Sequence, residues 1–360
     1  MSEVNKGKVI LGMSGGVDSS VAALLLKRQG YQVIGVFMKN WEEEENGVCC
    51  ANTDYEDVTK VCKQIGIPHY TLNFSKQYWE RVFAHCLKEF KDGYTPNPDI
   101  LCNREIKFNL FFEKAMELNA DYLATGHYCR NLFVEGERRL AKGKDPNKDQ
   151  SYFLYAINKR VLDRVLFPLG DLKKEEVREI ANRHQLATAK KKDSTGICFI
   201  GKRNFKDFLS KYIPIHPGNI ETLGGKIVGR HDGIAYYTIG QRKGLGIGGQ
   251  GEAWFVVGKD VARNALIVDQ GVGSQELYSK SLIATELSWL GELSLSLPFR
   301  CKAKIRYRQN DEICTIIQME NKEIHVEFDS LQKAVAPRQS IVFYDGEICL
   351  GGAIIRKSFS

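Results

Sequence analysis

The chain contains 360 residues, of which 51 are basic and 44 acidic, so its formal net charge at pH 7 is +7. This length exceeds what one typical core supports and predicts two or three domains. The mildly basic charge is compatible with a nucleic-acid partner and equally with an ordinary basic enzyme. The N-terminus lacks the apolar stretch of a signal peptide, and no apolar run comes close to the length of a membrane span, about 18 residues. We therefore expect a soluble, cytoplasmic protein without a membrane partner.

Strand and helix patterns alternate over the first 130 residues. Apolar runs predict strands at 9–13, 32–38, 69–74 and 121–125, and apolar periodicity predicts helices at 17–28, at 53–65, beyond Ser75 and at 103–118. Thr53 and Glu56 match a capping box, and Ser75 is expected to cap the helix that follows it. Strands that alternate with helices predict an α/β fold with a doubly wound, Rossmann-like parallel sheet.

A glycine-rich turn, Ser14-Gly15-Gly16-Val17-Asp18-Ser19-Ser20, separates the first strand from the first helix. The turn contains no lysine, so it is not the P-loop of nucleotide triphosphatases, and it does not match G-x-G-x-x-G either. Loops at the carboxyl ends of a doubly wound sheet bind the ligand. Backbone amides and the helix dipole at this turn therefore predict a site for a phosphate-like anion, and a turn without function is the alternative.

The second half of the chain has a different pattern. Residues 218–273 are rich in glycine, with short β-type runs, and predict a small central β-rich domain. Alternating runs at 301–307, 313–318, 324–328 and 341–344 predict a β-barrel. We therefore expect three domains, at 1–202, 203–272 and 273–360.

Ten cysteines in a cytoplasmic protein are expected to be mostly reduced and buried. No two of them form a C-x-x-C pair, so the common spacings of zinc and iron–sulfur sites are missing and no protein-held metal is expected.

The turn resembles the pyrophosphate loop of N-type ATP pyrophosphatases, which split ATP between its α- and β-phosphates. The resemblance implies ATP as cofactor, with Mg²⁺ held through the ATP phosphates and Asp18 as its candidate protein ligand. The implied nucleotide-binding residues are Gly12, Met13, Ser14, Gly15, Gly16, Val17, Asp18, Ser19, Met38 and Gly126. For Met38, a place in the apolar core is the alternative.

Longer motifs point to one family within this superfamily. They lie at 37–41, 95–103, 124–128, 148–152, 193–200, 237–244 and 305–309, and they include Thr95-Pro96-Asn97-Pro98-Asp99-Ile100-Leu101-Cys102-Asn103 and Asp193-Ser194-Thr195-Gly196-Ile197-Cys198-Phe199-Ile200. In this order they resemble the tRNA-specific 2-thiouridylases, the MnmA family, from end to end. The resemblance implies a pyrophosphatase domain, a central domain and a C-terminal barrel. It also implies ATP-dependent replacement of O2 of the wobble uridine by sulfur, giving 2-thiouridine, AMP and pyrophosphate.

The resemblance assigns two cysteines to sulfur transfer. Cys198 would receive sulfur as a persulfide from a sulfur-carrier protein, and Cys102 would release it as hydrosulfide or help to deliver it directly. The sequence leaves both routes open. Asp99 would act as acid or base at the target base, and a turn residue after Pro98 is the alternative. Cys102 is expected in a loop before a helix, a setting that can lower a thiol pKa; a buried loop residue is the alternative.

The resemblance implies that tRNA contacts Asn97, Pro98, Asp99, His127, Lys148, Asp149, Gln150, Arg306, Tyr307 and Gln339. His127 has the alternative of a hydrogen-bonded core histidine. Arg306 and Tyr307 would point to opposite faces if they lie in a strand, so one of them could be structural. Arg338 stands where the family often has glycine, which puts the turn near Gln339 in doubt, and Cys129 stands where alanine is commoner.

Two other function classes compete. Another adenylating pyrophosphatase would need neither a cysteine pair nor an RNA-binding barrel, and a non-catalytic RNA-binding protein would not need the intact loop. A thiolase with an iron–sulfur cluster is disfavoured by the missing C-x-x-C pair.

Overall fold

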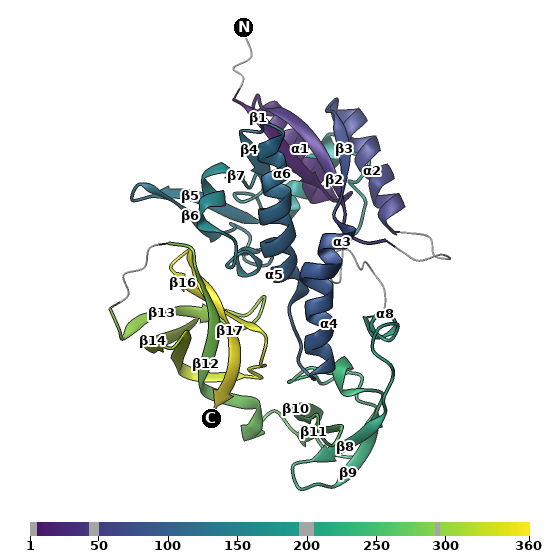
Figure 1. Ribbon diagram of the computed structural model, residues 1–360, viewed down its shortest axis with the longest axis vertical. Coiled ribbons are helices and arrows are strands. Elements are labelled where there is room, and N and C mark those ends of the chain that lie inside the picture. The colour runs from purple at the N-terminus through teal and green to yellow at the C-terminus, as the bar shows by residue number, and fades with distance from the viewer. Residues whose placement is uncertain (1–5, 43–49, 194–204, 292–295) are drawn as a thin grey trace.

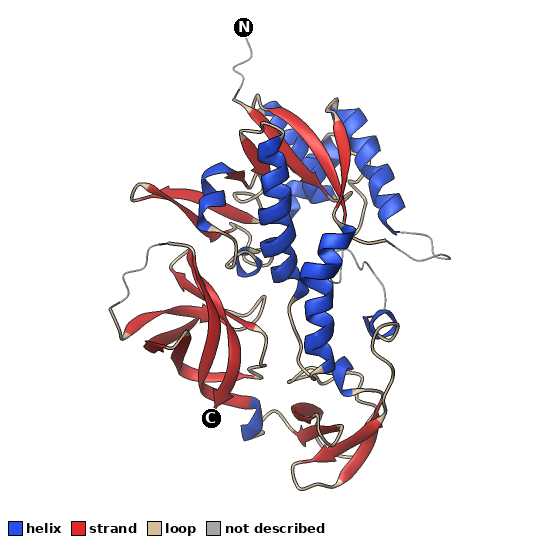
Figure 2. Cartoon of the chain, viewed as in Figure 1, coloured by secondary structure: helices blue, strands red, loops and turns tan. Residues whose placement is uncertain are grey.

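A computed structural model describes residues 6–42, 50–193, 205–291 and 296–360. Figure 1 shows a parallel sheet with its helices at one end of the molecule and two further β structures at the other. Figure 2 shows that the long helices cluster around the parallel sheet, whereas the other two parts consist mainly of strands and loops. No helix within the described ranges is long and apolar enough to cross a membrane.

The parallel sheet contains five strands in the order β3-β2-β1-β4-β7. The strands are β1 (Lys8–Met13), β2 (Gln32–Lys39), β3 (His69–Asn73), β4 (Tyr122–Ala124) and β7 (Val165–Leu166), and all neighbours pair in parallel. Val9, Leu11 and Met13 of β1 pack into one core cluster, and Ile10 packs into another on the opposite face. Both faces of the sheet are thus buried, which confirms the doubly wound fold.

Helices cover the two faces. The first face carries α1 (Val17–Arg28), α2 (Cys50–Ile65) and α7 (Lys174–Arg183), and the second carries α3 (Ser75–Tyr78), α5 (Pro98–Cys102) and α6 (Phe111–Glu117). Helix α4 (Ala84–Lys91) extends away from the sheet (Figure 1), and its buried residues Cys86 and Phe90 pack against Leu209 in a separate cluster. Two predicted helix caps are wrong. Helix α2 begins before Thr53, so Thr53 and Glu56 form no capping box. Ser75 is the first helical residue, and Asn73 Oδ1 accepts its N–H at 2.9 Å.

The helix that follows the Thr95–Asn97 stretch begins five residues earlier than predicted. Asn97 is the N-cap, and its Oδ1 accepts a hydrogen bond from Ile100 N at 3.3 Å, while Pro98 occupies the first helical position. A π-helical segment, Asn103–Leu110, joins α5 to α6. Asp99 and Cys102 therefore lie inside a helix, and the predicted loop before the helix and the alternative turn role of Asp99 are both wrong.

An unpredicted β-hairpin follows β4 and extends from the first domain. Its strands are β5 (Cys129–Val134) and β6 (Glu137–Lys142), and Glu135 and Gly136 form the turn with φ of +51° and +84°. The β6 strand pairs with β17 (Ile348–Phe359) at Ala141 and Ile348. The hairpin thus extends the sheet of the C-terminal barrel.

Six antiparallel strands form that barrel, as predicted. Their order is β12-β15-β14-β13-β16-β17, and a β12–β17 pairing closes it. The bounds are β12 (Tyr278–Trp289), β13 (Phe299–Lys304), β14 (Glu312–Glu320), β15 (Glu323–Lys333) and β16 (Ser340–Asp345). Because β13 ends at Lys304, Arg306 and Tyr307 lie in the following turn, and the prediction that places them in a strand is wrong.

In the sequence, the small central domain lies between the first domain and the barrel. A short helix, α8 (Phe205–Leu209), leads into a four-stranded sheet of order β10-β11-β8-β9. The strands are β8 (Gly218–Thr222), β9 (Ile227–His231), β10 (Trp254–Asp260) and β11 (Ala265–Gln270), and β8 pairs with β11 in parallel. The predicted β-rich character of this domain is confirmed.

Candidate nucleotide and thiol site

The loop after β1 lies at the switch point of the sheet, where the chain order reverses between β1 and β4. The segments that follow these two strands approach each other closely at this point. A Cβ added at Gly126 would lie only 3.0 Å from Ser19 N and 3.2 Å from Asp18 C. Ligands of doubly wound sheets bind at this position. A glycine at 126 lets the segment after β4 approach the first turn of α1 closely.

The loop itself is held in a conformation that requires glycine at one position. Gly15 has φ of +71°, and a Cβ there would lie 2.5 Å from Asp54 O on α2. Ser14 and Ser19 brace the turn, since Ser19 Oγ accepts from Ser14 N at 3.2 Å and donates to Gly16 O at 3.2 Å. Thr188 holds the next residue by donating to Ser20 Oγ at 2.9 Å. The loop is thus rigidly shaped before any ligand binds.

The first turn of α1 offers backbone amides to a ligand. Its N-cap is Gly16, which has no side chain to cap these amides, and Asp18 lies in the same turn. An uncapped helix N-terminus favours an anion. Met13 and Val17 are buried in the core beneath the loop, and Met38 is 8% exposed within the second core cluster. Their side chains support the loop, and the space over Gly12 is bounded by Phe111 and Met38.

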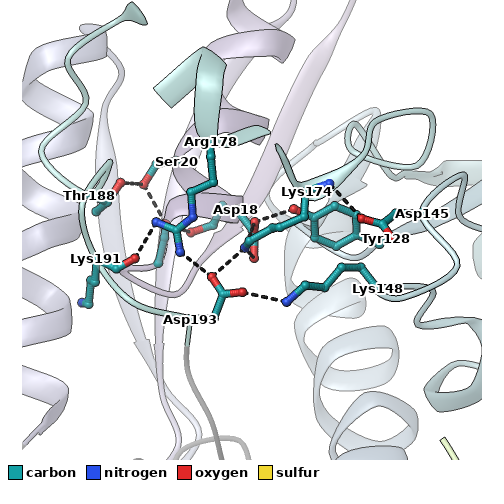
Figure 3. A network of polar contacts seen from close by, with 12 residues as sticks. Asp18, Ser20, Tyr128, Asp145, Lys148, Lys174, Arg178, Thr188, Lys191 and Asp193 are labelled. Carbon is teal, nitrogen blue, oxygen red and sulfur yellow. Dashed lines mark hydrogen bonds and ion pairs between the residues drawn. The ribbon is translucent and has the colours of Figure 1, made fainter. Parts of the chain in front are cut away.

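Asp18 is the anionic centre of a network of polar contacts (Figure 3). Lys174 Nζ, from the first turn of α7, lies 2.7 and 2.9 Å from the two Asp18 carboxylate oxygens. Tyr128 donates its hydroxyl to Asp18 Oδ1 at 2.7 Å. Burial and the neighbouring Asp18 carboxylate raise the pKa of Tyr128, so the phenol stays protonated and remains a donor.

Asp193 forms the second anionic point of the network (Figure 3). Lys148, Lys174 and Arg178 contact its carboxylate at 2.7, 2.8 and 2.5 Å. Partial burial raises its pKa, but the hydrogen bonds from the two lysines outweigh burial and hold the pKa well below its usual range. Asp193 is therefore ionised at any physiological pH.

A further cation, Lys191, ties the glycine loop to α2. Lys191 Nζ donates to Gly15 O at 2.9 Å and contacts Asp54 and Asp57 at 2.7 and 2.6 Å. Burial lowers the pKa of Lys191, but the contacts with the two carboxylates raise it by more, so the net shift of this pKa is upward. The segment that leads to Asp193 is thereby fixed beside the loop. None of Lys174, Arg178, Lys191 or Tyr128 was assigned from the sequence, although Tyr128 and Asp193 belong to recognised motifs.

The predicted catalytic thiol and carboxylate lie on α5. Cys102 is fully buried within the core cluster that contains Ile10, Met38 and Phe111. Asp99 is half-buried one turn earlier. Burial raises the pKa of the nearby Cys86 thiol to about 12, with smaller contributions from the Glu89 carboxylate and then from Asp99. Cys198 lies outside the described residues, so the distance between the two cysteines is not fixed by the structure.

Three family models match consecutive segments of the chain. The tRNA methyl transferase HUP domain matches residues 7–202, the tRNA methyl transferase PRC-barrel domain residues 206–270, and the aminomethyltransferase beta-barrel domain residues 279–355. A tRNA-specific 2-thiouridylase MnmA of Protochlamydia amoebophila is 61% identical over 98% of this chain and 94% of its own length. The tRNA-specific 2-thiouridylase MnmA 2 of Geobacillus kaustophilus is 58% identical over 98% and 95%.

The chain belongs to the tRNA-specific 2-thiouridylase family. A solved structure of the U34-tRNA thiolase NcsA from Methanococcus maripaludis is a more distant likeness, with 20% identity, a TM-score of 0.36 and coverage of 59% of this chain and 69% of that one.

In this member of the 2-thiouridylase family, several predicted tRNA-contact residues are engaged inside the protein. Asp149 is 5% exposed, and its carboxylate accepts from Gly143 N, Ser151 N and Ser151 Oγ at 3.0–3.1 Å. Gln150 Oε1 accepts from Tyr128 N at 3.0 Å. Lys148 forms an ion pair with Asp193 and so belongs to the network of polar contacts beside the glycine loop.

His127 is buried among aromatic rings rather than displayed. Its Nδ1 lies 2.8 Å from Thr125 Oγ1, and its ring contacts Phe108 and Phe167. Burial, with a smaller contribution from Lys107, holds the pKa of His127 well below its ordinary value, so the ring is neutral. This geometry is that of a hydrogen-bonded core histidine.

The barrel residues assigned to tRNA lie on turns next to the first domain. Arg306 is exposed, and its guanidinium donates to the backbone carbonyls of Lys333 and Ala334. The Tyr307 ring is half-buried, 4.5 Å from the Phe153 ring. Gln339 donates its side-chain N–H to Thr95 O, two residues before Asn97. The barrel therefore contacts the chain just ahead of α5.

Arg338, which stands where the family often has glycine, adopts the backbone conformation of a glycine. Arg338 has φ of +68°, a conformation that favours glycine. Its guanidinium forms ion pairs with Glu89 of α4, at 2.5 Å from Nε, and with Glu286 of β12, at 3.0 Å. The side chain thus offsets the backbone strain with contacts between the barrel and the first domain.

Proposed function

We propose that this chain uses ATP to replace O2 of the wobble uridine in tRNA anticodons with sulfur, in the cytoplasm. The observation that carries the proposal is the braced, lysine-free glycine loop at the switch point of the sheet, in a chain whose tRNA-specific 2-thiouridylase relatives are 58% and 61% identical over 98% of its length. We also propose domain boundaries at 1–202, 203–272 and 273–360.

Adenylation solves a leaving-group problem. A uracil carbonyl oxygen is a poor leaving group, and transfer of AMP from ATP to O2 makes it a good one while pyrophosphate departs. The loop amides, the Ser14 and Ser19 hydroxyls and the dipole of α1 would hold the phosphates. Asp18, with one-third of its side chain exposed, offers a carboxylate of the kind that binds Mg²⁺ together with substrate phosphates, and Mg²⁺ would neutralise the phosphate charge there.

Sulfur then displaces AMP at C2. A carrier protein would leave a persulfide on Cys198, and the Cys102 thiolate would attack the Cys198 sulfur. The S–S bond of the persulfide breaks, hydrosulfide leaves and a Cys102–Cys198 disulfide forms; alternatively the persulfide attacks C2 directly, and Cys102 releases the product. Because Cys102 is fully buried, its thiol has to become accessible when tRNA and the Cys198 segment engage. Asp99, half-buried on the same helix, would move protons at the base.

The test uses the purified full chain with unmodified tRNA, ATP, Mg²⁺ and a persulfide donor. We expect AMP release that depends on tRNA, and 2-thiouridine in the digested product. AMP release without tRNA would point to another adenylating enzyme, and tRNA binding without either product would point to a non-catalytic RNA-binding protein; each result contradicts the proposal.

Cysteine variants separate the roles of the two thiols. Cys102→Ser should still load sulfur onto Cys198 yet form no 2-thiouridine, whereas Cys198→Ser should load none. Cys62→Ala is a matched control, because Cys62 is buried in the opposite core and burial raises its thiol pKa to about 11. Peptide mass spectrometry identifies the loaded residue, and sulfur on Cys102 in Cys198→Ser would reverse the assignment.

A further inference from the structure

The strongest unassigned feature is the ammonium group of Lys174 beside the glycine loop. The loop sequence lacks the lysine with which a P-loop contacts phosphates. Lys174, which follows Asp18 by 156 residues in the sequence, brings its Nζ to both oxygens of the Asp18 carboxylate. Figure 3 shows this side chain reaching from α7 across to the first turn of α1.

We propose that Lys174 is a phosphate-binding residue that supplies the cation missing from the loop and contacts the β- and γ-phosphates of ATP. This inference rests on the proposed use of ATP and adds a residue to that site. Lys174 is only 12% exposed, and in the described structure its charge is directed at the loop and not at solvent.

The surrounding charges allow Lys174 to change partners. Asp193, its second partner, keeps Lys148 and Arg178 when Lys174 turns to a phosphate, so no carboxylate is left unpaired there. Asp18 keeps the Tyr128 hydroxyl and is the candidate Mg²⁺ ligand. An ion pair with Asp18 therefore holds the ammonium in position until the phosphates replace the carboxylate as its acceptor.

The backbone around Lys174 is also fixed. Lys174 N donates to Asp145 Oδ2 at 2.9 Å, and Asp145 is 8% exposed. Lys173, the preceding residue, is exposed and offers the same charge on the same helix end without a side chain directed at Asp18. The pair Lys173 and Lys174 thus provides a matched comparison at almost one position.

The experiment measures equilibrium binding of ATP, inorganic pyrophosphate and AMP to the full chain by calorimetry, without tRNA. We expect Lys174→Gln to weaken ATP and pyrophosphate about 10- to 100-fold, the effect of one charge-assisted hydrogen bond, with AMP changed less than about threefold. Lys173→Gln should bind all three like the wild type. Unchanged ATP affinity in Lys174→Gln, or an equal loss for ATP and AMP, overturns the proposal.

A second measurement, in Mg²⁺-free buffer with chelator, excludes a purely structural role. Without Mg²⁺, the Asp18 carboxylate only repels the phosphates and competes with them for Lys174, so Asp18→Asn should bind ATP more tightly than the wild type. The double variant Asp18→Asn with Lys174→Gln should not show this increase in ATP affinity. Equal affinities of the single and double variants would make Lys174 a counter-ion of Asp18 and nothing more. A wild-type chain that binds no ATP would instead contradict the proposed function itself.

Discussion

Replacing Gly15 by alanine should damage the nucleotide loop much more than the fold. At φ of +71° an alanine costs about 1–2 kcal/mol of stability. Its Cβ would also lie 2.5 Å from Asp54 O, so that contact has to open by about 0.9 Å to reach the 3.4 Å of ordinary packing. Because Asp54 is on α2 and is tied to Lys191, the loop has to move instead. A displacement near 1 Å at a reacting centre costs about 100-fold in rate.

Gly136→Ala is the control, since Gly136 has φ of +84° with no atom within 4 Å of an added Cβ. Chemical unfolding followed by circular dichroism should show a loss of about 1–2 kcal/mol for Gly136→Ala and at least that for Gly15→Ala. The rate of tRNA-dependent AMP release should fall about 100-fold in Gly15→Ala only, and calorimetry should show weakened ATP binding in that variant only. If Gly15→Ala binds ATP and releases AMP like Gly136→Ala, the loop is not the phosphate site.

Three further outcomes follow from the structure. Arg338→Ala should be about 1 kcal/mol less stable than Arg338→Gly and unfold at a lower denaturant concentration. Both variants lose the ion pairs with Glu89 and Glu286, but only alanine keeps the strain of the left-handed conformation. Equal unfolding midpoints would contradict this. Because the pKa of His127 is depressed in the folded chain, the unfolded chain binds a proton at this residue first as the pH falls below about 6.5. The stability of the wild type should therefore decrease below that pH, and the stability of His127→Gln should decrease less. Unfolding midpoints measured against pH check this. Arg306→Ala should weaken tRNA binding and lower its salt slope by about one if it contacts one phosphate, and an unchanged slope assigns it to the turn alone.

The fold could be predicted from the sequence where one local pattern determines the structure. Apolar runs buried on both faces, such as Val9–Met13, indicate a parallel strand whatever their surroundings. The start of α5 differs from the predicted one because Pro98 is compatible with both a loop and the first position of a helix; Asn97 followed by proline is an N-cap pattern. The hairpin at Glu135-Gly136 had only a weak signal, because glycine suits a two-residue turn but the flanking runs 129–134 and 137–142 do not alternate between apolar and polar residues.

Residues that depend on long-range contacts could not be found in this way. Lys174 is one lysine in a helical segment rich in charge, and only the fold brings it to Asp18. The burial of His127 and Asp149 likewise depends on packing between distant segments. The departure from glycine at Arg338 put the nearby turn in doubt, and the structure shows that Arg338 keeps a backbone conformation typical of glycine, with φ of +68°.

The pairing of β6 with β17 has a consequence for how the chain is made. Ala141 and Ile348 are neighbours in one sheet but are synthesised about 200 residues apart. At about 5–20 residues per second, the hairpin edge waits on the order of 10–40 s on the ribosome before its partner emerges. During that time Tyr152 and Tyr155, which pack with Val342 and Tyr344 in one core cluster, lack the barrel side of their environment. Ribosome-bound chains of the first domain alone should therefore present an open strand edge and a half-built core to chaperones.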